Sequence, residues 1–338
     1  MTTSEPQFSA ESGRGGEFVR QANRFTGRPE AAAGRYQLVV SLACPWAHRA
    51  VIVRRLLGLE DALGLSIVDP IRDETGWRFT NHPDGRDPVT GLAFLADAYR
   101  ASDPTYAGRV TVPAIIDLTT GHVVTNDYPQ ITLDLSTRWT ALHRAGAPEL
   151  YPQALRAEID AVAADVFRDV NNGVYRCGFA TTQGAYEAAF DALFARLDAL
   201  EKRLTGQRYL VGDTITEADI RLFTTLVRFD AVYHGHFKTN LRKLTEYPVL
   251  WAYARDLFQT EGFGDTVDFD HIKRHYYVTH DRINPTGIVP KGPDPALWLT
   301  PHGRGRTGGG RTPAPSGAAS TAPARCAGCP APPPTRPG

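Results

Sequence analysis

The stretch SLACPWAHRA, residues 41–50, places one cysteine between an apolar run typical of a strand and an expected helix. Cys44 is followed by Pro45, and proline is favoured at the first position of a helix. The N–H groups and partial positive charge of a helix N-terminus stabilise a thiolate. We therefore expect Cys44 to be reactive with a lowered pKa, aided by positive charge from His48 and Arg49. The alternative is a small buried apolar residue.

The position at which a dithiol motif would carry its second cysteine is Ala47. Cys44 therefore cannot close a local disulfide, and a mixed disulfide formed there needs an external thiol for its release. Glutathione is the obvious cytosolic supplier of that thiol. Cys177 could resolve the disulfide if it lay close in space, but a structural role is the simpler interpretation.

The elements around Cys44 predict a thioredoxin-like domain over residues 35–143. Short apolar, β-rich runs indicate strands, and the order β-α-β followed by β-β-α is the thioredoxin-like arrangement. Pro113 stands where such folds carry a cis-proline, which exposes the backbone of Val112 to a peptide-like ligand. The expected elements are a strand at 35–41, a helix at 45–57, a strand at 65–69, a hairpin of 111–117 with 122–127, and a helix at 128–138.

Two segments extend this domain. Residues 70–109 are rich in turn-forming residues and contain Trp77, and they are too long for an ordinary connection. They form either a functional insertion or a connection that hides a helix. Residues 1–34 are polar and rich in Gly and Arg, and we expect them to wrap the surface as an arm.

Residues 150–290 predict an all-α domain, so the fold class is a thioredoxin-like α/β domain followed by a helical domain of the glutathione-transferase type. Apolar residues recur with helical spacing on one face between 186 and 204. Further along, Thr216 and Asp219 have the spacing of a capping box at a helix N-terminus.

Residues 295–338 predict a disordered tail dominated by Pro, Gly, Ala and Arg, a composition that cannot bury a core. The tail carries Cys326 and Cys329 with the spacing of a metal or redox pair. Zinc needs four ligands, and this segment offers no second pair and no nearby histidine. We therefore expect an incidental pair and no metal site.

Charge and hydropathy exclude several classes of partner. The 37 basic and 37 acidic residues give a formal net charge of zero, so we expect no nucleic-acid partner. No apolar run approaches the length of a membrane span, and the N-terminus lacks the pattern of a secretory signal. The scattered cysteines do not form a disulfide framework, which favours a reducing, cytoplasmic location.

Several motifs together resemble the glutathionyl-hydroquinone reductases, the Xi class of glutathione transferases. They are SLACPWAHRA, TVPAIID, NNGVYRCGFATTQ, YLVGDTITEADIRLF and HIKRHYYVTHDRINPTGIVPKGP, and the likeness runs from about Gly16 to Pro293. The resemblance implies that Cys44 attacks the thioether sulfur of a glutathionyl-hydroquinone and frees the hydroquinone. A second glutathione would then release the cysteine and leave as oxidised glutathione. It also implies no bound cofactor, small-molecule thiol conjugates as ligands, and a homodimer.

The same resemblance assigns roles to residues at both ends of the site. It implies that Trp77 covers the bound glutathione, that Arg109 pairs with one of its carboxylates, and that Val112 binds its cysteinyl backbone. Tyr175, Tyr276 and Tyr277 resemble the tyrosines that line the hydroquinone site, with Tyr175 and Tyr276 in the catalytic roles. Flat aromatic walls and phenolic hydroxyls suit a hydroquinone, and the ring carbon must gain a proton when sulfur leaves.

One position departs from the family pattern. The family has Glu-Ser at the helix that binds the γ-glutamyl group, whereas this chain has Asp127 and Tyr128. The change raises the alternative of another low-molecular-weight thiol as reductant. Two other functions also stay open: a cysteine-type thioltransferase or reductive dehalogenase, and a non-catalytic ligand-binding relative of the transferases.

Overall fold

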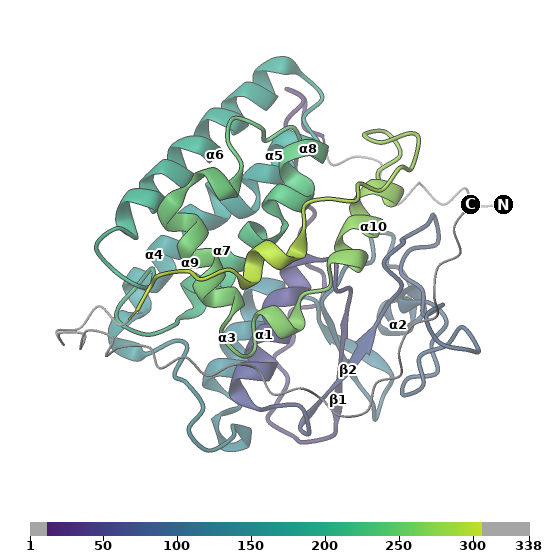
Figure 1. Cartoon of the computed structure of the whole chain (residues 1–338). Helices are drawn as coiled ribbons and strands as arrows, with labels where there is room; N and C mark the ends of the chain where they lie inside the picture. Colours follow the sequence, from purple (N-terminus) through teal and green to yellow (C-terminus); the bar gives the residue numbers. More distant parts are fainter. Residues whose placement is uncertain (1–11, 306–338) are drawn as a thin grey trace, which may run out of the picture. The chain divides into compact units, whose positions relative to one another are not determined.

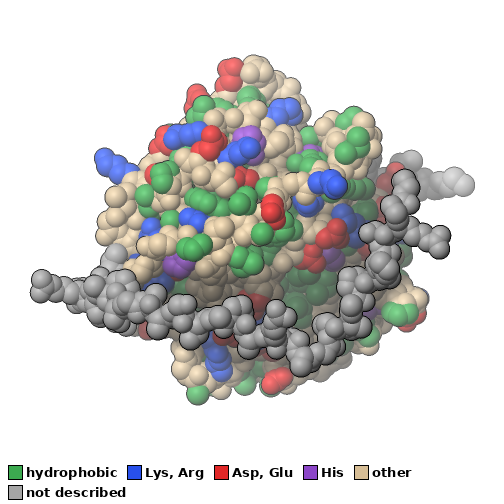
Figure 2. Space-filling view, viewed as in Figure 1, with side chains coloured by type: hydrophobic (Ala, Val, Ile, Leu, Met, Phe, Trp, Pro, Cys, Tyr) green, Lys and Arg blue, Asp and Glu red, His purple; other side chains and the backbone are tan. Residues whose placement is uncertain are grey.

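The computed structural model describes residues 12–305, so the predicted pair Cys326 and Cys329 and most of the predicted tail lie outside the described residues. Within this range the chain forms a small sheet flanked by helices, followed by a set of helices (Figure 1). No helix in this range is both long and apolar enough to cross a membrane. Basic and acidic side chains are intermingled over the face seen in Figure 2, in keeping with the net charge of zero.

The N-terminal domain has the predicted thioredoxin-like order. Its strands are β1 (Tyr36–Val40), β2 (Leu63–Ile67), β3 (Ala114–Asp117) and β4 (His122–Thr125). The sheet order is β2-β1-β3-β4, with β1 and β2 parallel and the other two pairs antiparallel. The parallel pair requires a crossover, which α1 (Pro45–Leu57) supplies, and α3 (Tyr128–Thr137) follows β4.

Local signals explain why α1 has the predicted bounds. Pro45 occupies its first turn, and Gly58 ends it in the left-handed conformation, with its N–H bonded to the carbonyls of Arg54 and Arg55. Most of α1 is buried, because α3 and α7 (Glu217–Arg228) pack against it. The start of α1, which follows Cys44, is therefore held in place by contacts with both domains.

The long connection between β2 and β3 agrees with one of the two predicted alternatives, a hidden helix. It contains a helix, α2 (Leu95–Ser102), and irregular turns that place Trp77 in the core. The arm before β1 pairs Thr26 with Thr125 of β4, and Phe18 is buried against aromatic rings of the helical domain.

The helical domain is built as predicted, on capped amphipathic helices. The N–H and hydroxyl of Thr216 both donate to the Asp219 carboxylate, at 2.9 and 3.0 Å, so the capping box is confirmed. Leu193, Leu197 and Leu200 lie on the buried face of α6 (Gln183–Arg203). The remaining helices are α4 (Arg156–Val166), α5 (Gly173–Gly178), α6 (Gln183–Arg203), α8 (His234–His236), α9 (Pro248–Phe258) and α10 (Phe269–Thr279).

The prediction of a disordered tail from residue 295 is wrong for residues 295–305. Pro295–Leu299 forms a short 3-10 helix, and Trp298 is buried with its ring 4.7 Å from that of Trp251. Arg304 donates from Nη2 to the carbonyls of Gln207 and Arg208, both at 2.8 Å. Trp298 and Arg304 therefore hold residues 295–305 against the helical domain, although the composition of this segment predicted no burial.

A buried arginine joins the two domains next to Cys44. Arg228 of α7 donates to the carbonyl of Ala43 at 2.8 Å and to that of Leu42 at 3.0 Å. It also donates to its own helix, at Thr224 O, 2.8 Å away. These bonds satisfy carbonyls in a buried loop and fix the two residues that precede the cysteine.

Candidate active site

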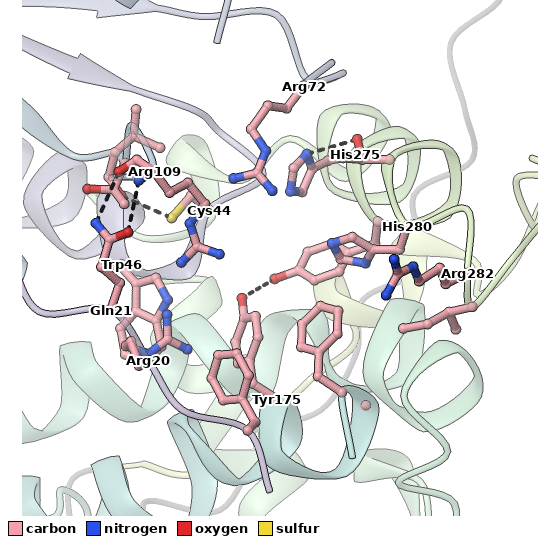
Figure 3. A pocket seen from close by; sticks show the side chains of 18 of the residues that line it. Arg20, Gln21, Cys44, Trp46, Arg72, Arg109, Tyr175, His275, His280 and Arg282 are labelled. Carbon is pink, nitrogen blue, oxygen red and sulfur yellow. Dashed lines mark hydrogen bonds between the residues drawn. The ribbon is translucent and has the colours of Figure 1, made fainter. Parts of the chain in front are cut away.

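A cavity of about 430 Å³ opens beside Cys44. Its walls come from the arm, the insertion, the start of α1, the cis-proline loop, α5, α10 and the loop after α10. In Figure 3, Cys44 lies on one side of the open space and Tyr175 on another, with Arg72, His275 and His280 along the remaining sides. The cavity therefore lies between the two domains.

Cys44 occupies the N-terminus of α1, and its side chain is partly exposed to the cavity. The peptide bond between Val112 and Pro113 is cis, as predicted, and the Val112 carbonyl lies 3.5 Å from the Cys44 Sγ. Burial raises the pKa of the Cys44 thiol, while the N–H groups of Ala47 and Trp46 oppose that shift. The predicted lowering of the pKa is thus wrong for the unliganded protein, because desolvation of the thiolate outweighs the helix N-terminus.

Of the two residues expected to supply positive charge, His48 does not, whereas the charge of Arg49 interacts with that of the Cys44 thiolate. His48 is 1% exposed, and its Nδ1 lies 3.1 Å from Arg228 Nη1, which can only donate. Its Nε2 lies 2.8 Å from Thr266 Oγ1, and burial holds the pKa of His48 well below its usual range, so the ring is neutral. Arg49 is bonded to Asn171 at 2.8 Å, and neither side chain lines the cavity.

Trp77, Arg109 and Val112 all line the cavity near Cys44, where the resemblance placed glutathione. Trp77 is 3% exposed and stacks on His275 with ring centroids 5.2 Å apart. Its Nε1 has no hydrogen-bond partner within residues 12–305, so a ligand acceptor could satisfy it. The side chain of Gln21, on the arm, accepts a hydrogen bond from the Arg109 N–H at 2.8 Å and donates one to the Arg109 carbonyl at 3.2 Å. These bonds fix the position of the Arg109 backbone.

The two residues that depart from the family pattern have different environments. Tyr128 lines the cavity with its ring 4.8 Å from that of Trp46, and burial raises the pKa of its hydroxyl. Asp127 precedes α3 and accepts a hydrogen bond from Asn23 at 3.0 Å, but it is not among the lining residues. An aromatic ring therefore occupies the wall at the start of α3.

The tyrosines form a chain of hydroxyl groups at the opposite end. The hydroxyls of Tyr175 and Tyr276 lie 2.5 Å apart, and Tyr233 lies 3.0 Å from Tyr276. Burial raises the pKa of Tyr175 and Tyr276 well above the ordinary value, so both remain protonated at neutral pH. Tyr277 is not brought to the cavity: its hydroxyl donates to Ala231 O at 3.3 Å. Neighbouring positions on α10 point in different directions, and of these two tyrosines only Tyr276 lines the cavity.

The cavity carries more positive than negative charge. Asp281 is its one acidic lining residue among the described residues, against five basic ones. Such a wall favours an anionic ligand, and it surrounds aromatic groups suited to a flat ring. The basic lining residues are Arg20, Arg72, Arg109, Lys238 and Arg282.

Several lining residues were missed by the sequence analysis. Arg20 and Gln21 belong to the polar arm, which has no periodicity that marks a site. His275 lies in the RHYY motif, directly before Tyr276, and its Nδ1 bonds the Pro70 carbonyl at 2.7 Å. The RHYY motif was the sequence feature that could have identified His275 as a site residue.

The second cysteine of the described chain does not serve Cys44. Cys177 of α5 is buried, does not line the cavity, and burial raises its pKa to about 12. A thiol with that pKa supplies almost no thiolate at neutral pH. Within residues 12–305 no group of histidine, cysteine and carboxylate side chains is arranged to hold a metal ion.

Comparisons with known proteins point to one family. Residues 183–256 match the model for the glutathione S-transferase C-terminal domain. The chain is 47% identical to the glutathionyl-hydroquinone reductase PcpF of Sphingobium chlorophenolicum. The alignment spans 286 residues and covers 82% of this chain and 90% of the relative. It is 44% identical to the glutathionyl-hydroquinone reductase YqjG of Escherichia coli, over 86% of this chain and 93% of the relative.

Solved structures agree. A glutathione transferase from Gordonia bronchialis is 63% identical and superposes with a TM-score of 0.80, over 80% of this chain and 84% of the other. The glutathione-bound structure of YqjG superposes with a TM-score of 0.78 at 43% identity, over 86% of this chain and 97% of the other. The sequence comparison and the structural comparison therefore both find this chain similar to glutathione transferases, and both include YqjG.

Proposed function

This chain belongs to the glutathionyl-hydroquinone reductases, the Xi class of glutathione transferases, and on that premise we propose that it removes the glutathionyl group from glutathionyl-hydroquinones. The reaction uses glutathione and yields free hydroquinone and oxidised glutathione. The observation that carries the proposal is a single cysteine, Cys44, that opens on a cavity shared with a pair of phenolic hydroxyls, those of Tyr175 and Tyr276.

The first step is attack of the Cys44 thiolate on the thioether sulfur. A disulfide forms between Cys44 and glutathione, the bond from sulfur to the ring carbon breaks, and its electron pair passes to the ring. Bonds from Arg228 to the carbonyls of Leu42 and Ala43 support this step, because they hold the cysteine loop in one position.

The ring carbon must also gain a proton. Tyr175 and Tyr276 suit this role, since their raised pKa values keep both hydroxyls protonated. The bond between the two hydroxyls, and that from Tyr276 to Tyr233, form a chain along which a proton lost to the ring can be replaced. The aromatic walls around Tyr175 suit the flat product.

A second glutathione completes the cycle. Its thiolate attacks the mixed disulfide, restores Cys44 and leaves as oxidised glutathione. Among residues 12–305 no second thiol is available to Cys44, because Ala47 stands where a local partner would be and Cys177 is buried away from the cavity, which supports release by an external thiol.

Glutathione binding is assigned to the cavity wall near Cys44. Trp77 offers an unpartnered buried N–H, Arg109 a positive charge, and Val112 its backbone at the cis-proline. Tyr128 forms the cavity wall at the start of α3. Asp127 does not line the cavity and accepts a hydrogen bond from Asn23, so it would affect glutathione only through its neighbour Tyr128.

The ring of Tyr128 also supports a second candidate, in which another low-molecular-weight thiol is the better reductant. An aromatic ring at this position hydrogen-bonds the γ-glutamyl group of glutathione less well than the serine hydroxyl of the family pattern would. Turnover with glutathione, cysteine and N-acetylcysteine at equal concentrations separates the candidates. Selective use of glutathione excludes the second one.

The test of the function is product analysis with glutathionyl-menadiol and excess glutathione. We expect one menadiol and one oxidised glutathione for each substrate consumed. Failure to release menadiol from a protein with a reactive Cys44 would favour a thioltransferase or dehalogenase of related chemistry. An inert thiol with intact ligand binding would favour a non-catalytic binding protein.

Two further assignments belong to the proposal. The need for reduced glutathione is consistent with a cytoplasmic location, and the family resemblance suggests a homodimer. Light scattering after size-exclusion chromatography tests the dimer directly, because a mass near 37.0 kDa would identify a monomer instead.

A further inference from the structure

Arg20 of the N-terminal arm lies in the cavity wall between the Cys44 end and the tyrosine end. The centre of its guanidinium group is 4.6 Å from the Trp46 ring, 4.9 Å from that of Tyr175 and 5.1 Å from that of Phe18. A cation over aromatic faces is stabilised by their negative electrostatic potential. The charge of Arg20 is thereby held in the cavity wall, against aromatic rings.

Hydrogen bonds hold the arm on both sides of Arg20. Gly16 O accepts from Thr181 N at 2.9 Å, and Gln21 Oε1 accepts from Arg109 N at 2.8 Å. Arg20 itself donates from Nε to Asn172 Oδ1 at 3.0 Å. These contacts reach both domains, so the guanidinium group is oriented before any ligand binds.

One nitrogen of this group has no protein acceptor. Arg20 Nη2 is buried, and within residues 12–305 it has no hydrogen-bond partner. Nor does any carboxylate in that range form an ion pair with Arg20. A buried charged donor without an acceptor is costly, and an oxygen of a bound ligand would remove that cost.

The charge of Arg20 also reaches the reacting groups. It opposes the effect of burial on the pKa of Cys44 and on that of Tyr175, since a nearby cation favours both the thiolate and the phenolate. Arg20 is therefore near enough to act on negative charge at either end of the reaction.

We propose that Arg20 is a further catalytic residue, whose Nη2 donates a hydrogen bond to a ring oxygen of the hydroquinone and stabilises the negative charge that develops there. The inference rests on the proposed function. As Cys44 forms the disulfide, the electron pair of the broken C–S bond enters the ring and is shared with its oxygens before the ring carbon takes a proton. The two sulfur atoms are oxidised to the disulfide, and the ring carbon is reduced by the same pair.

The test compares two reactions of Cys44 in Arg20→Gln. Reduction of glutathionyl-menadiol places charge on a ring, whereas glutathione-dependent reduction of the disulfide between glutathione and 2-mercaptoethanol does not. We expect kcat for the first to fall by about 10²-fold, the typical effect of removing one donor to a developing oxyanion. The second should stay within about threefold, because only a modest electrostatic effect on the thiolate is lost.

Arg24→Gln is the matched control, since Arg24 lies on the same arm but pairs with Asp103 at an exposed position outside the cavity. It should leave both reactions unchanged. Arg20→Lys should regain part of the first reaction, because it keeps the charge but loses the planar fork.

Equal loss of both reactions in Arg20→Gln, or retention of both, overturns the proposal. If Arg20→Gln does not fold, Arg20→Lys decides in the same way: a selective loss of the menadiol reaction supports the role, and an equal or absent loss refutes it. Absence of menadiol release by the unmodified protein is a separate result, which overturns the proposed function and this role with it.

Discussion

The hydroxyl oxygens of Tyr175 and Tyr276 lie 2.5 Å apart, although the two residues are 101 positions apart in the chain. Tyr175 comes from α5 and Tyr276 from α10, so the pair exists only when these helices pack together. Tyr276 is also 3.0 Å from Tyr233, and a hydroxyl placed between two others can pass one proton along while it receives another.

Tyr276→Phe tests this chain. We expect cleavage of the thioether to slow by about 10²-fold, because the proton donor loses its neighbour. Glutathione-dependent disulfide exchange at Cys44 needs no proton on carbon and should persist. Tyr277→Phe is the control: Tyr277 follows Tyr276 on α10, but its hydroxyl contacts only the Ala231 carbonyl in the described part of the chain. Equal loss of both reactions in Tyr276→Phe would reduce the pair to a structural role.

The raised pKa of Cys44 predicts a pH dependence of its reactivity. Burial favours the neutral thiol, so the thiolate appears only as the pH rises through a pKa above the ordinary value of about 8.5. The rate of alkylation by iodoacetamide in the unliganded protein should therefore increase with pH, with its midpoint above that value. Mass spectrometry of the Cys44 peptide separates this reaction from alkylation of Cys177, Cys326 and Cys329, and Cys44→Ser should show no alkylation at residue 44. A midpoint near pH 6 or 7 would mean that the helix N-terminus prevails over desolvation.

Arg228→Met should destabilise the fold and disturb the cysteine loop. The substitution leaves the buried carbonyls of Leu42 and Ala43 without their charged donor, a loss of about 3 kcal/mol in the free energy of unfolding. Urea denaturation followed by circular dichroism measures it. Arg274→Met, at an exposed ion pair with Asp270, should change that free energy by no more than about 0.5 kcal/mol. Similar values for the two variants would refute the role given to Arg228.

Tyr128→Ser tests whether the aromatic wall at the start of α3 limits glutathione binding. We expect KM for glutathione to fall by about fivefold, the value of one added hydrogen bond of about 1 kcal/mol. Tyr128→Phe, which keeps the ring and removes only its hydroxyl, should leave KM close to that of the unmodified protein. A higher KM in Tyr128→Ser would show that the ring contributes to binding instead.

Much of the fold follows from local signals in the sequence. Pro45 and Gly58 set the ends of α1, Thr216 and Asp219 form the cap of α7, and Pro113 is cis as its position predicts. The ends of α1 and the cap of α7 depend on residues that are neighbours in the chain, whereas the cis-proline was expected from its place in the thioredoxin-like order of elements. The sequence could therefore report them without any knowledge of packing.

The parts of the site that sequence analysis missed depend on distant contacts. Arg20 meets Asn172 across 152 positions, and Gln21 meets Arg109 across 88. We expected His48 to supply positive charge because it follows Cys44 by one helical turn, but burial, together with the charge of Arg228 from the other domain, keeps the ring neutral. No local pattern in the sequence carries such information.

The central claim is that Cys44 itself receives the glutathionyl group. The most direct measurement mixes the protein with one equivalent of glutathionyl-menadiol and no free glutathione, followed by acid quenching, mass spectrometry of the Cys44 peptide and quantification of menadiol. The account predicts one menadiol released per protein and a glutathione disulfide on Cys44 that disappears when glutathione is added, and neither product in Cys44→Ser. Release of menadiol only when free glutathione is present, with Cys44 unmodified throughout, would contradict it.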